Sequence, residues 1–270
     1  MNVLENFDLF LLDMDGVIYK GNQPIPGSVD TVKRLYGRNK KIIFLTNNPS
    51  GSEAAYKRKL QSMGIKASSE QIITSVKSLC HYLTGRIKNI SNRSAYVIGS
   101  KHLRNSVGKT EIKLVSPAAD GADYVIMGGH TDFNYNEIDH ASRFIRNGAK
   151  LIATNRDPYY PSEHGLSPGT GALLSSIEIS GGKKALITGK PEKYIFQLSL
   201  KLTGIRKNRA VIIGDSLKTD ILGGVNYGIH TVLTLSGITD TKQLRQSSIK
   251  PSRVINTLSS LIPQTVNEPA

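Results

Sequence analysis

Cysteine, tryptophan and long apolar runs are scarce in this 270-residue sequence. One cysteine, Cys80, is present, so an intrachain disulfide and a cysteine zinc site are both excluded. No uninterrupted apolar run exceeds four residues, which excludes a transmembrane helix, because such a helix needs about 20 apolar residues. The N-terminus, MNVLENFDLF, lacks the basic segment and long apolar stretch of a secretory signal. We therefore expect a protein of the reducing cytoplasm with no membrane partner.

Acidic residues are also few, with 21 Asp and Glu against 35 Lys and Arg, so the formal net charge is +14. Such an excess is typical of proteins that bind nucleic acid, a membrane surface or a phosphorylated substrate, and also of proteins whose charge only keeps them soluble. The basic residues are dispersed, and no tract of five or more like charges occurs. With 6% aromatic residues, few side chains can stack on single-stranded nucleic acid. We therefore do not expect a nucleic-acid partner.

Short apolar segments typical of strands alternate with segments of helical periodicity. Residues 28–38 carry an apolar stripe that predicts a helix, and another helix is predicted to open at Pro191. Alternation of this kind favours parallel sheets covered by helices on both faces. The predicted strands are residues 9–12, 41–46, 95–98, 112–115, 124–127, 151–154, 185–188, 210–213 and 231–235.

Acidic residues follow two of these predicted strands. Asp13 and Asp15 come directly after the first strand, and Asp215 and Asp220 come after a late one. In an open α/β sheet, ligands bind at the carboxyl ends of the strands. Carboxylates gathered there from distant parts of the chain are typical of a site for a hard divalent cation such as Mg²⁺. A solvated acidic turn or an N-cap aspartate is the alternative at each position, but neither accounts for the matched set.

Polar residues follow two further predicted strands. Thr46 and Asn47 offer a hydroxyl, an amide and backbone N–H groups that can hold phosphate oxygens. Lys190 follows the strand at 185–188, where a lysine can place a point charge on a phosphate. Taken singly, each of these is more typical of an ordinary turn or a surface lysine. Together with the carboxylates they are a far more specific pattern.

In order and spacing these segments resemble the haloacid dehalogenase-like hydrolase superfamily, and in detail its subclass IIA. This NagD-like branch contains para-nitrophenylphosphatases, phosphoglycolate phosphatases and ribonucleotide monophosphatases. One departure is His130, where relatives commonly carry an acidic residue, and it concerns the substrate preference of a cap rather than the core chemistry. The resembling stretches are Leu12-Asp-Met-Asp-Gly-Val17, Leu45-Thr-Asn-Asn48, Ala153-Thr-Asn-Arg-Asp157 with Pro168-Gly-Thr-Gly171, Gly189-Lys-Pro191 and Gly214-Asp-Ser-Leu-Lys-Thr-Asp220.

The resemblance implies a role for each matching residue. Asp13 would be the nucleophile that takes the phosphoryl group, and Asp15 would be the general acid/base. Thr46 and Asn47 would bind phosphate, and Lys190 would hold the phosphate and Asp13 in register. The implied metal ligands for Mg²⁺ are Asp13, the backbone carbonyl of Asp15, and Asp215, with Asp220 supporting the metal shell through water.

The stretch between Asn48 and Lys190 is too long for one crossover connection, so we expect an inserted domain. The predicted fold is α/β: a Rossmann-like three-layer core with a parallel sheet, residues 1–80 and 182–270, and an α/β cap, residues 81–181. Asn155 and Asp157, at the end of a cap strand, are the predicted substrate contacts. A cap would exclude water and select substrates by size.

The sequence thus predicts a Mg²⁺-dependent phosphatase that hydrolyses small phosphate monoesters through an aspartyl-phosphate intermediate. Two alternatives stay open: a phosphotransferase on the same fold, and a nucleic-acid-binding protein on a degenerate hydrolase fold, which only the net charge supports. The expected partner is a small phosphorylated metabolite: a nucleoside monophosphate, phosphoglycolate, glycerol phosphate or a sugar phosphate. A homodimer is also left open.

Overall fold

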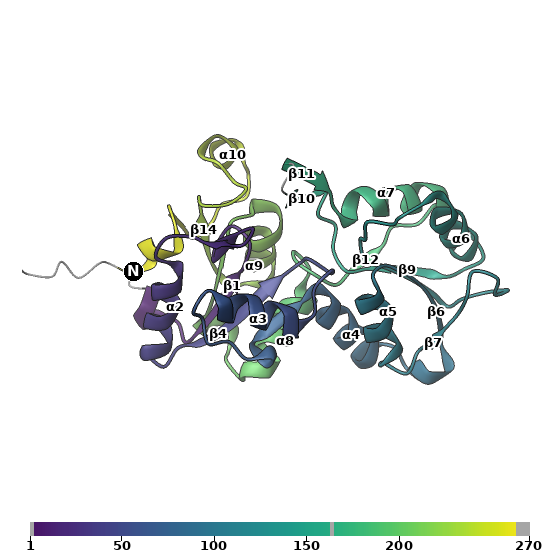
Figure 1. The fold of residues 1–270 in the computed structure, drawn as a ribbon, viewed down its shortest axis with the longest axis horizontal. Helices are drawn as coiled ribbons and strands as arrows, with labels where there is room; N and C mark the ends of the chain where they lie inside the picture. The colour runs from purple at the N-terminus through teal and green to yellow at the C-terminus, as the bar shows by residue number, and fades with distance from the viewer. Residues whose placement is uncertain (1–2, 163–164, 263–270) are drawn as a thin grey trace, which may run out of the picture. The chain divides into compact units, whose positions relative to one another are not determined.

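The structure is a computed structural model that describes residues 3–162 and 165–262. The chain forms two compact units (Figure 1). The first unit comprises Met1–Leu45, Tyr56–Ile72 and Ser199–Ala270, and the second comprises Thr46–Ala55 and Ile73–Leu198. The predicted domain boundaries, at 80/81 and 181/182, stay a prediction.

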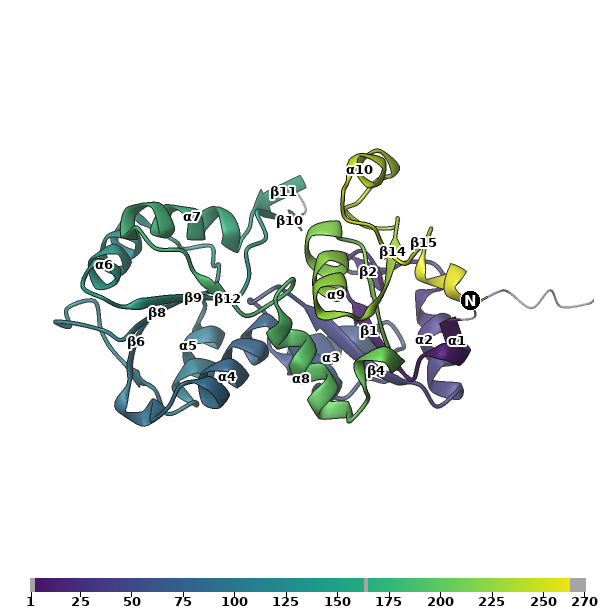
Figure 2. The ribbon, with the colours of Figure 1, turned by 180° about the vertical axis from the view of Figure 1, so that it is seen from behind.

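A six-stranded parallel sheet forms the centre of the first unit, in the order β15-β14-β13-β1-β4-β5. Every residue of β1 and β13 is buried, as expected of central strands that are covered on both faces. Figures 1 and 2, from opposite sides, show helix α2 on one face and α9 on the other. The strands are β1 (Leu9–Asp13), β4 (Lys41–Thr46), β5 (Ile72–Thr74), β13 (Ala210–Gly214), β14 (His230–Thr234) and β15 (Arg253–Ile255).

The second unit is built on a parallel five-stranded sheet, in the order β12-β9-β8-β6-β7. Successive residues of β8 point to opposite faces: Val125 and Met127 join a core cluster with α6 and α7, and Ile126 joins one with α4 and α5. The strands are β6 (Ser94–Ile98), β7 (Lys113–Leu114), β8 (Tyr124–Met127), β9 (Lys150–Ala153) and β12 (Leu186–Ile187). An antiparallel pair, β10 (Tyr159–Ser162) with β11 (Gly165–Pro168), belongs to the same unit, whereas the antiparallel pair of β2 (Tyr19–Lys20) with β3 (Gln23–Pro24) belongs to the first unit.

The helices complete the α/β pattern that the sequence predicted, and the fold class is confirmed. In the described part of the chain, no helix has the length and hydropathy that a membrane crossing requires. The α-helices are α1 (Val3–Asn6), α2 (Ser28–Gly37), α3 (Glu53–Ser62), α4 (Ser75–Arg86), α5 (Lys101–Gly108), α6 (Tyr135–Arg146), α7 (Thr170–Gly181), α8 (Lys193–Thr203), α9 (Leu222–Tyr227) and α10 (Thr241–Gln246). Shorter helical turns are η1 (Ser69–Gln71), η2 (Ile90–Asn92), η3 (Lys207–Arg209), η4 (Leu217–Ile221) and η5 (Leu258–Leu261).

Local differences from the predicted elements are small. The strand predicted at 112–115 is shortened to Lys113–Leu114, and β5, β15 and the β10–β11 hairpin were not predicted. Helix α8 begins at Lys193, so Pro191 precedes the helix, and its predicted position inside the first turn is wrong. Strands of two to four residues show too little of the alternation on which a sequence prediction rests.

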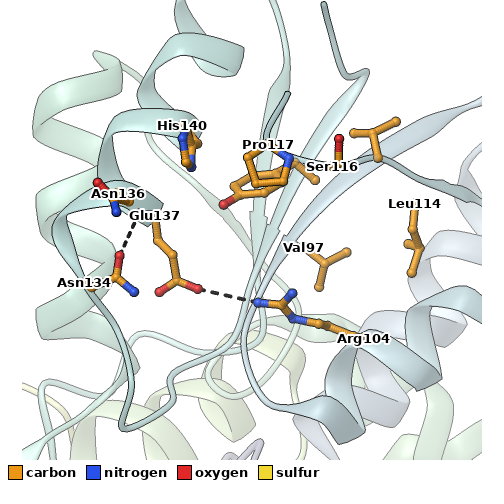
Figure 3. Close-up of a pocket in the computed structure, with 11 residues that line it drawn as sticks. Val97, Arg104, Leu114, Ser116, Pro117, Asn134, Asn136, Glu137 and His140 are labelled. Atoms are coloured by element: carbon orange, nitrogen blue, oxygen red, sulfur yellow. Dashed lines mark hydrogen bonds and ion pairs between the residues drawn. The ribbon is translucent and has the colours of Figure 1, made fainter. Parts of the chain in front are cut away.

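A cavity of about 510 Å³ lies in the second unit beside β6 and α6. Figure 3 shows Arg104 and Glu137 facing one another across it, with a distance of 3.6 Å between Nη2 and Oε1. Glu137 also contacts His130, whose Nε2 lies 3.0 Å from Oε2. His130 therefore packs against the Glu137 carboxylate in the first turn of helix α6.

Helix α7 is tied to the loop that follows β9 through a buried carboxylate. Glu178 is 4% exposed, and both of its oxygens pair with the Arg156 guanidinium at 2.5 and 2.9 Å. Lys184 Nζ and the backbone N–H of Ala185 donate to the same carboxylate, each at 2.8 Å. The Arg156 hydrogen bonds, with these further donors, hold the pKa of Glu178 at about 2. This network fixes the loop after β9 against α7.

Replacing Glu178 by Gln should lower the free energy of unfolding at pH 7 by about 2 kcal/mol, because the charged partners lose their acceptor. The carboxyl pKa falls from 4.5 to about 2 on folding, so its stabilisation is complete above pH 4.5 and is lost as the pH falls towards 2. The difference between wild type and Glu178→Gln should therefore shrink across that range. Urea unfolding from pH 7 to pH 3 measures it. Glu111→Gln, at an exposed position, is the control, and a difference independent of pH would contradict this account.

Candidate active site

Asp13 and Asp215 lie at the carboxyl ends of neighbouring parallel strands. Asp13 is the last residue of β1, and Asp215 directly follows β13. The register pairs Leu12 with Ile213, so both aspartates leave the sheet at the same edge. The apolar residues before them place both strands in the core, and each aspartate comes where its apolar run ends while still being buried. The structure therefore places these two predicted site residues at the same edge of the sheet.

Asp220 reaches the same edge from a π-helical turn, η4. The backbone N–H of Ile221 donates to the Ser216 carbonyl at 3.1 Å, which closes a turn wider than that of an α-helix. Asp220 Oδ2 in turn accepts a hydrogen bond of 3.3 Å from the Ser216 N–H. A Cβ at Gly214 would lie 2.1 Å from Asp220 Cγ, so glycine is required where this side chain folds back over the strand end.

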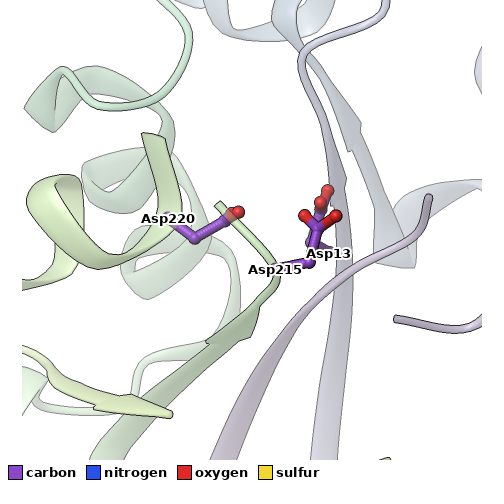
Figure 4. A group of neighbouring side chains, drawn as sticks. All are labelled: Asp13, Asp215 and Asp220. Carbon is purple, nitrogen blue, oxygen red and sulfur yellow. The ribbon is translucent and has the colours of Figure 1, made fainter. Parts of the chain in front are cut away.

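The three carboxylates form a compact buried cluster. One oxygen each from Asp13, Asp215 and Asp220 can be chosen so that all lie within 4.8 Å of one another (Figure 4). Buried negative charges this close repel strongly, so a counter-charge at the cluster is favoured. Oxygen ligands at this spacing suit a hard divalent cation, and the donor set fits Mg²⁺.

Two loops hold the Asp215 carboxylate in place. Its Oδ2 accepts a hydrogen bond of 2.8 Å from the backbone N–H of Ile238, which follows β14. A Cβ at Gly237 would lie 1.7 Å from that oxygen, and one at Gly16 would lie 2.1 Å from it. The loop after β14 was not predicted as part of the site. The only signal for it is its place at the carboxyl end of a strand.

Asp15 belongs to the tight turn between β1 and the β2–β3 hairpin. Gly16, at φ 77°, allows this turn, and its N–H donates to the Tyr19 carbonyl at 2.8 Å. Tyr19 is fully buried, and burial together with the charge of Asp15 raises the pKa of its hydroxyl well above the ordinary range. The Lys59 ammonium lies 3.8 Å from the centre of the Tyr19 ring. Sequence reasoning missed both Tyr19 and Lys59, because an aromatic residue and a helical lysine carry no pattern of their own.

In the second unit, Asn47 and Lys190 are joined through the Asn47 side-chain amide. Its Oδ1 accepts from the Lys190 N–H at 2.8 Å, and its Nδ2 donates to the Lys190 carbonyl at 2.9 Å. Lys190 is 2% exposed. Thr46, at the end of β4, is buried, and its hydroxyl oxygen accepts from the Asn48 N–H at 3.1 Å. The structure thus brings together two of the three predicted phosphate-binding residues by direct hydrogen bonds.

Asn155 and Asp157 lie on the loop after β9, and both belong to the same network. Asp157 Oδ2 accepts from Asn47 Nδ2 at 2.8 Å and from Asn155 Nδ2 at 2.5 Å. Of the two predicted cap residues, Asp157 is therefore hydrogen-bonded directly to a predicted phosphate-binding residue and Asn155 is linked to it through Asp157, a connection that the sequence did not indicate. Their predicted contact with substrate stays a prediction.

The parallel α/β core carries acidic residues at the carboxyl ends of its strands, where ligands bind in such sheets, and comparison with known proteins identifies the family. Residues 10–113 match the haloacid dehalogenase-like hydrolases, and residues 187–261 match a HAD-hydrolase-like family. The acid sugar phosphatase of Staphylococcus saprophyticus is 30% identical over 96% of this chain and 98% of its own. The 5'-nucleotidase YutF of Bacillus subtilis is 30% identical over 96% and 99%. The chain belongs to the haloacid dehalogenase-like hydrolase family.

Solved structures agree with this assignment. The 4-nitrophenylphosphatase from Thermotoga maritima superposes with a TM-score of 0.89, at 30% identity, over 97% of this chain and 98% of its own. NagD from Escherichia coli K-12 gives 0.86 at 27% identity, over 95% and 100%. A glycerol phosphate phosphatase from Mycobacterium tuberculosis in complex with magnesium gives 0.89 at 27% identity, over 97% and 78%. The predicted subclass IIA, NagD-like phosphatase branch is confirmed.

Magnesium ions should stabilise the first unit through the buried carboxylates. At a Mg²⁺ concentration 100 times the dissociation constant, the expected gain is about 2.7 kcal/mol, seen as a rise in the thermal unfolding midpoint. Asp215→Asn removes a charged ligand and should abolish most of this rise. Asp30→Asn, at an exposed position on α2, should keep it in full. An equal rise in wild type and Asp215→Asn would contradict the assignment of this cluster as the cation site.

Proposed function

We propose that this protein is a Mg²⁺-dependent phosphatase that hydrolyses small phosphate monoesters through an aspartyl-phosphate intermediate on Asp13. The observation that carries the proposal is the cluster of three buried carboxylates at the ends of β1 and β13. A cluster of this kind costs folding energy unless a positive charge offsets it, and a divalent cation held there would stabilise the charge that develops on a phosphate ester. Membership of the haloacid dehalogenase-like hydrolase family gives the same activity class.

In the proposed reaction, a carboxylate oxygen of Asp13 attacks phosphorus while the bond from phosphorus to the leaving oxygen breaks. Asp15 donates a proton to that oxygen, so the alcohol departs neutral. Water then attacks the phosphorus of the aspartyl-phosphate, Asp15 takes its proton, and inorganic phosphate leaves while Asp13 is restored. Each of these two steps would have a lower activation barrier than a direct displacement by water.

The metal ligands proposed for this chain are Asp13, the backbone carbonyl of Asp15, and Asp215. Asp220 would support the metal shell through water. When bound there, Mg²⁺ would offset the repulsion between the Asp13 carboxylate and a phosphate dianion. Gly237 leaves the space that the Asp215 carboxylate occupies, which is why a larger residue there would displace a ligand.

Phosphate oxygens are the proposed partners of Thr46, Asn47 and Lys190. The Lys190 ammonium would supply positive charge to the phosphate. Because the side-chain amide of Asn47 is engaged by the backbone of Lys190 and by Asp157, the backbone N–H is the group that Asn47 would offer to a phosphate. The Thr46 hydroxyl would be a second neutral donor.

The proposed substrates are monoesters of small polar alcohols. Relatives and structural neighbours are named as an acid sugar phosphatase, a 5'-nucleotidase, a 4-nitrophenylphosphatase and a glycerol phosphate phosphatase. Their common element is the phosphate group, whereas the leaving groups differ. Sugar phosphates, glycerol phosphate, nucleoside monophosphates and phosphoglycolate, each assayed with and without Mg²⁺, would rank the leaving groups. The cytoplasmic location and a homodimer stay predictions.

Asp13→Asn should reduce the hydrolysis of 4-nitrophenyl phosphate by at least about 10³-fold while the protein stays folded, because the nucleophile is lost. Asp13→Ala is measured alongside, since deamidation of an asparagine would restore the aspartate. Asp30→Asn is the control for a lost surface charge in the same unit. Circular dichroism checks the fold. Activity retained in both Asp13 variants would rule out Asp13 as the nucleophile.

The same assay separates hydrolysis from phosphoryl transfer. With added glycerol as acceptor, a hydrolase releases inorganic phosphate and 4-nitrophenol in equal amounts. A phosphotransferase releases less phosphate than nitrophenol, because part of the phosphoryl group ends on glycerol. We expect equal amounts at low glycerol concentration.

A further inference from the structure

The carboxylate of Asp157 sits between two asparagine amides in the second unit. Its Oδ2 accepts from Asn47 Nδ2 at 2.8 Å and from Asn155 Nδ2 at 2.5 Å. Asn47 and Asp157 are 110 residues apart in the chain. An ionised oxygen suits this place, because hydrogen bonds to a charged acceptor are about twice as strong as those between neutral groups.

Both polar atoms of the Asn47 side chain take part in hydrogen bonds. Both protons of its Nδ2 have acceptors, the Lys190 carbonyl and Asp157 Oδ2, and its Oδ1 accepts from the Lys190 N–H. One amide thereby holds the backbone of Lys190 at both its N–H and its carbonyl. A Cβ at Gly189 would lie 2.6 Å from Asn47 Oδ1, so the backbone approaches the amide closely. Rotation of Asn47 would break all three hydrogen bonds at once.

The loop that carries Asp157 is fixed independently of Asn47. Arg156 pairs with the buried carboxylate of Glu178 on α7. The backbone N–H of Gly171, also on α7, donates to the Asp157 carbonyl at 2.8 Å. Any Cβ at Gly171 would lie 2.3 Å from the Arg156 carbonyl oxygen, so helix and loop are in close contact. Asp157 is therefore held on a rigid support.

We infer that Asp157 is a positioning residue for the phosphate-binding lysine. Its carboxylate orients the Asn47 amide, and that amide fixes the backbone from which the Lys190 side chain extends. The inference rests on the proposed function, and it gives Asp157 a role different from the substrate contact that the sequence predicts. A positioning residue acts on the phosphate, which all substrates share. A substrate contact acts on the leaving group, which differs among them.

Asp157→Ala leaves the Asn47 and Asn155 amides without this acceptor, so Asn47 is free to turn away from Lys190. We expect kcat/KM to fall by about 10- to 100-fold, the range seen when outer-shell partners of a site are removed. The loss should be equal for 4-nitrophenyl phosphate, glycerol phosphate and a nucleoside monophosphate. The inhibition constant of inorganic phosphate, which has no leaving group, should rise by a similar factor.

Two further variants control for effects on folding and charge. Asp157→Asn keeps an oxygen that can accept from both amides, so it should recover most of the activity although the charge is gone. Asp139→Ala, at an exposed position on α6 in the same unit, should leave activity and phosphate inhibition unchanged. If Asp157→Ala does not fold, the Asp157→Asn profile still decides, because a direct charge contact with substrate would lose activity there.

The outcomes separate this inference from the proposed function. A loss confined to one substrate, with unchanged phosphate inhibition, would assign Asp157 to the leaving group and overturn the positioning role, as would an active Asp157→Ala. If the wild-type protein hydrolyses no ester with Mg²⁺, the proposed function fails, and calorimetric binding of inorganic phosphate then compares wild type with Asp157→Ala. Absence of phosphate binding in the wild type would overturn both.

Discussion

Mutual repulsion among three buried carboxylates is the constraint on which the first unit of this protein depends. Asp13, Asp215 and Asp220 lie within reach of one another with little solvent to screen them. Repulsion of this kind destabilises a fold, so the surrounding structure has to hold the three carboxylates together. Parallel pairing of β1 with β13 fixes two of the carboxylates, and a π-helical turn brings in the third. A divalent cation bound there would offset this repulsion, and its binding would stabilise the fold.

In the second unit, neutral groups hold the backbone of a buried lysine. Lys190 is a buried cation, and the side chain of a lysine loses much of its hydration on burial. Its backbone is held by the Asn47 amide, which neither adds nor removes charge. The one charged group in that network, Asp157, meets Asn47 and Asn155 through a single oxygen. The groups that hold the lysine backbone are therefore neutral amides, and the one carboxylate of the network acts on those amides rather than on that backbone.

Sequence reasoning could place the acidic residues because the strand ends are a local feature. Asp13 and Asp215 are expected at strand ends from the apolar runs that precede them, and β1 pairs with β13 so that both lie at one edge of the sheet. The hydrogen bond between Asn47 and Asp157 could not be predicted from the sequence, since it joins loops 110 residues apart and depends on side-chain rotamers. The role of Gly237 was hidden for the same reason: a glycine after β14 has no meaning until the Asp215 carboxylate lies against it.

The burial of the basic residues changes how the net charge of +14 is interpreted. Within the described part of the chain, Lys190 is the only lysine or arginine that is buried, so the remaining basic residues lie at or near solvent. At physiological ionic strength their field decays over about 8 Å, and they can do little more than draw anions towards the surface. A buried lysine is not screened in this way. Under the proposed function, recognition of phosphate would therefore depend on the placement of one cation rather than on the excess of cations, and the residues that set its backbone would matter more than the surface charge.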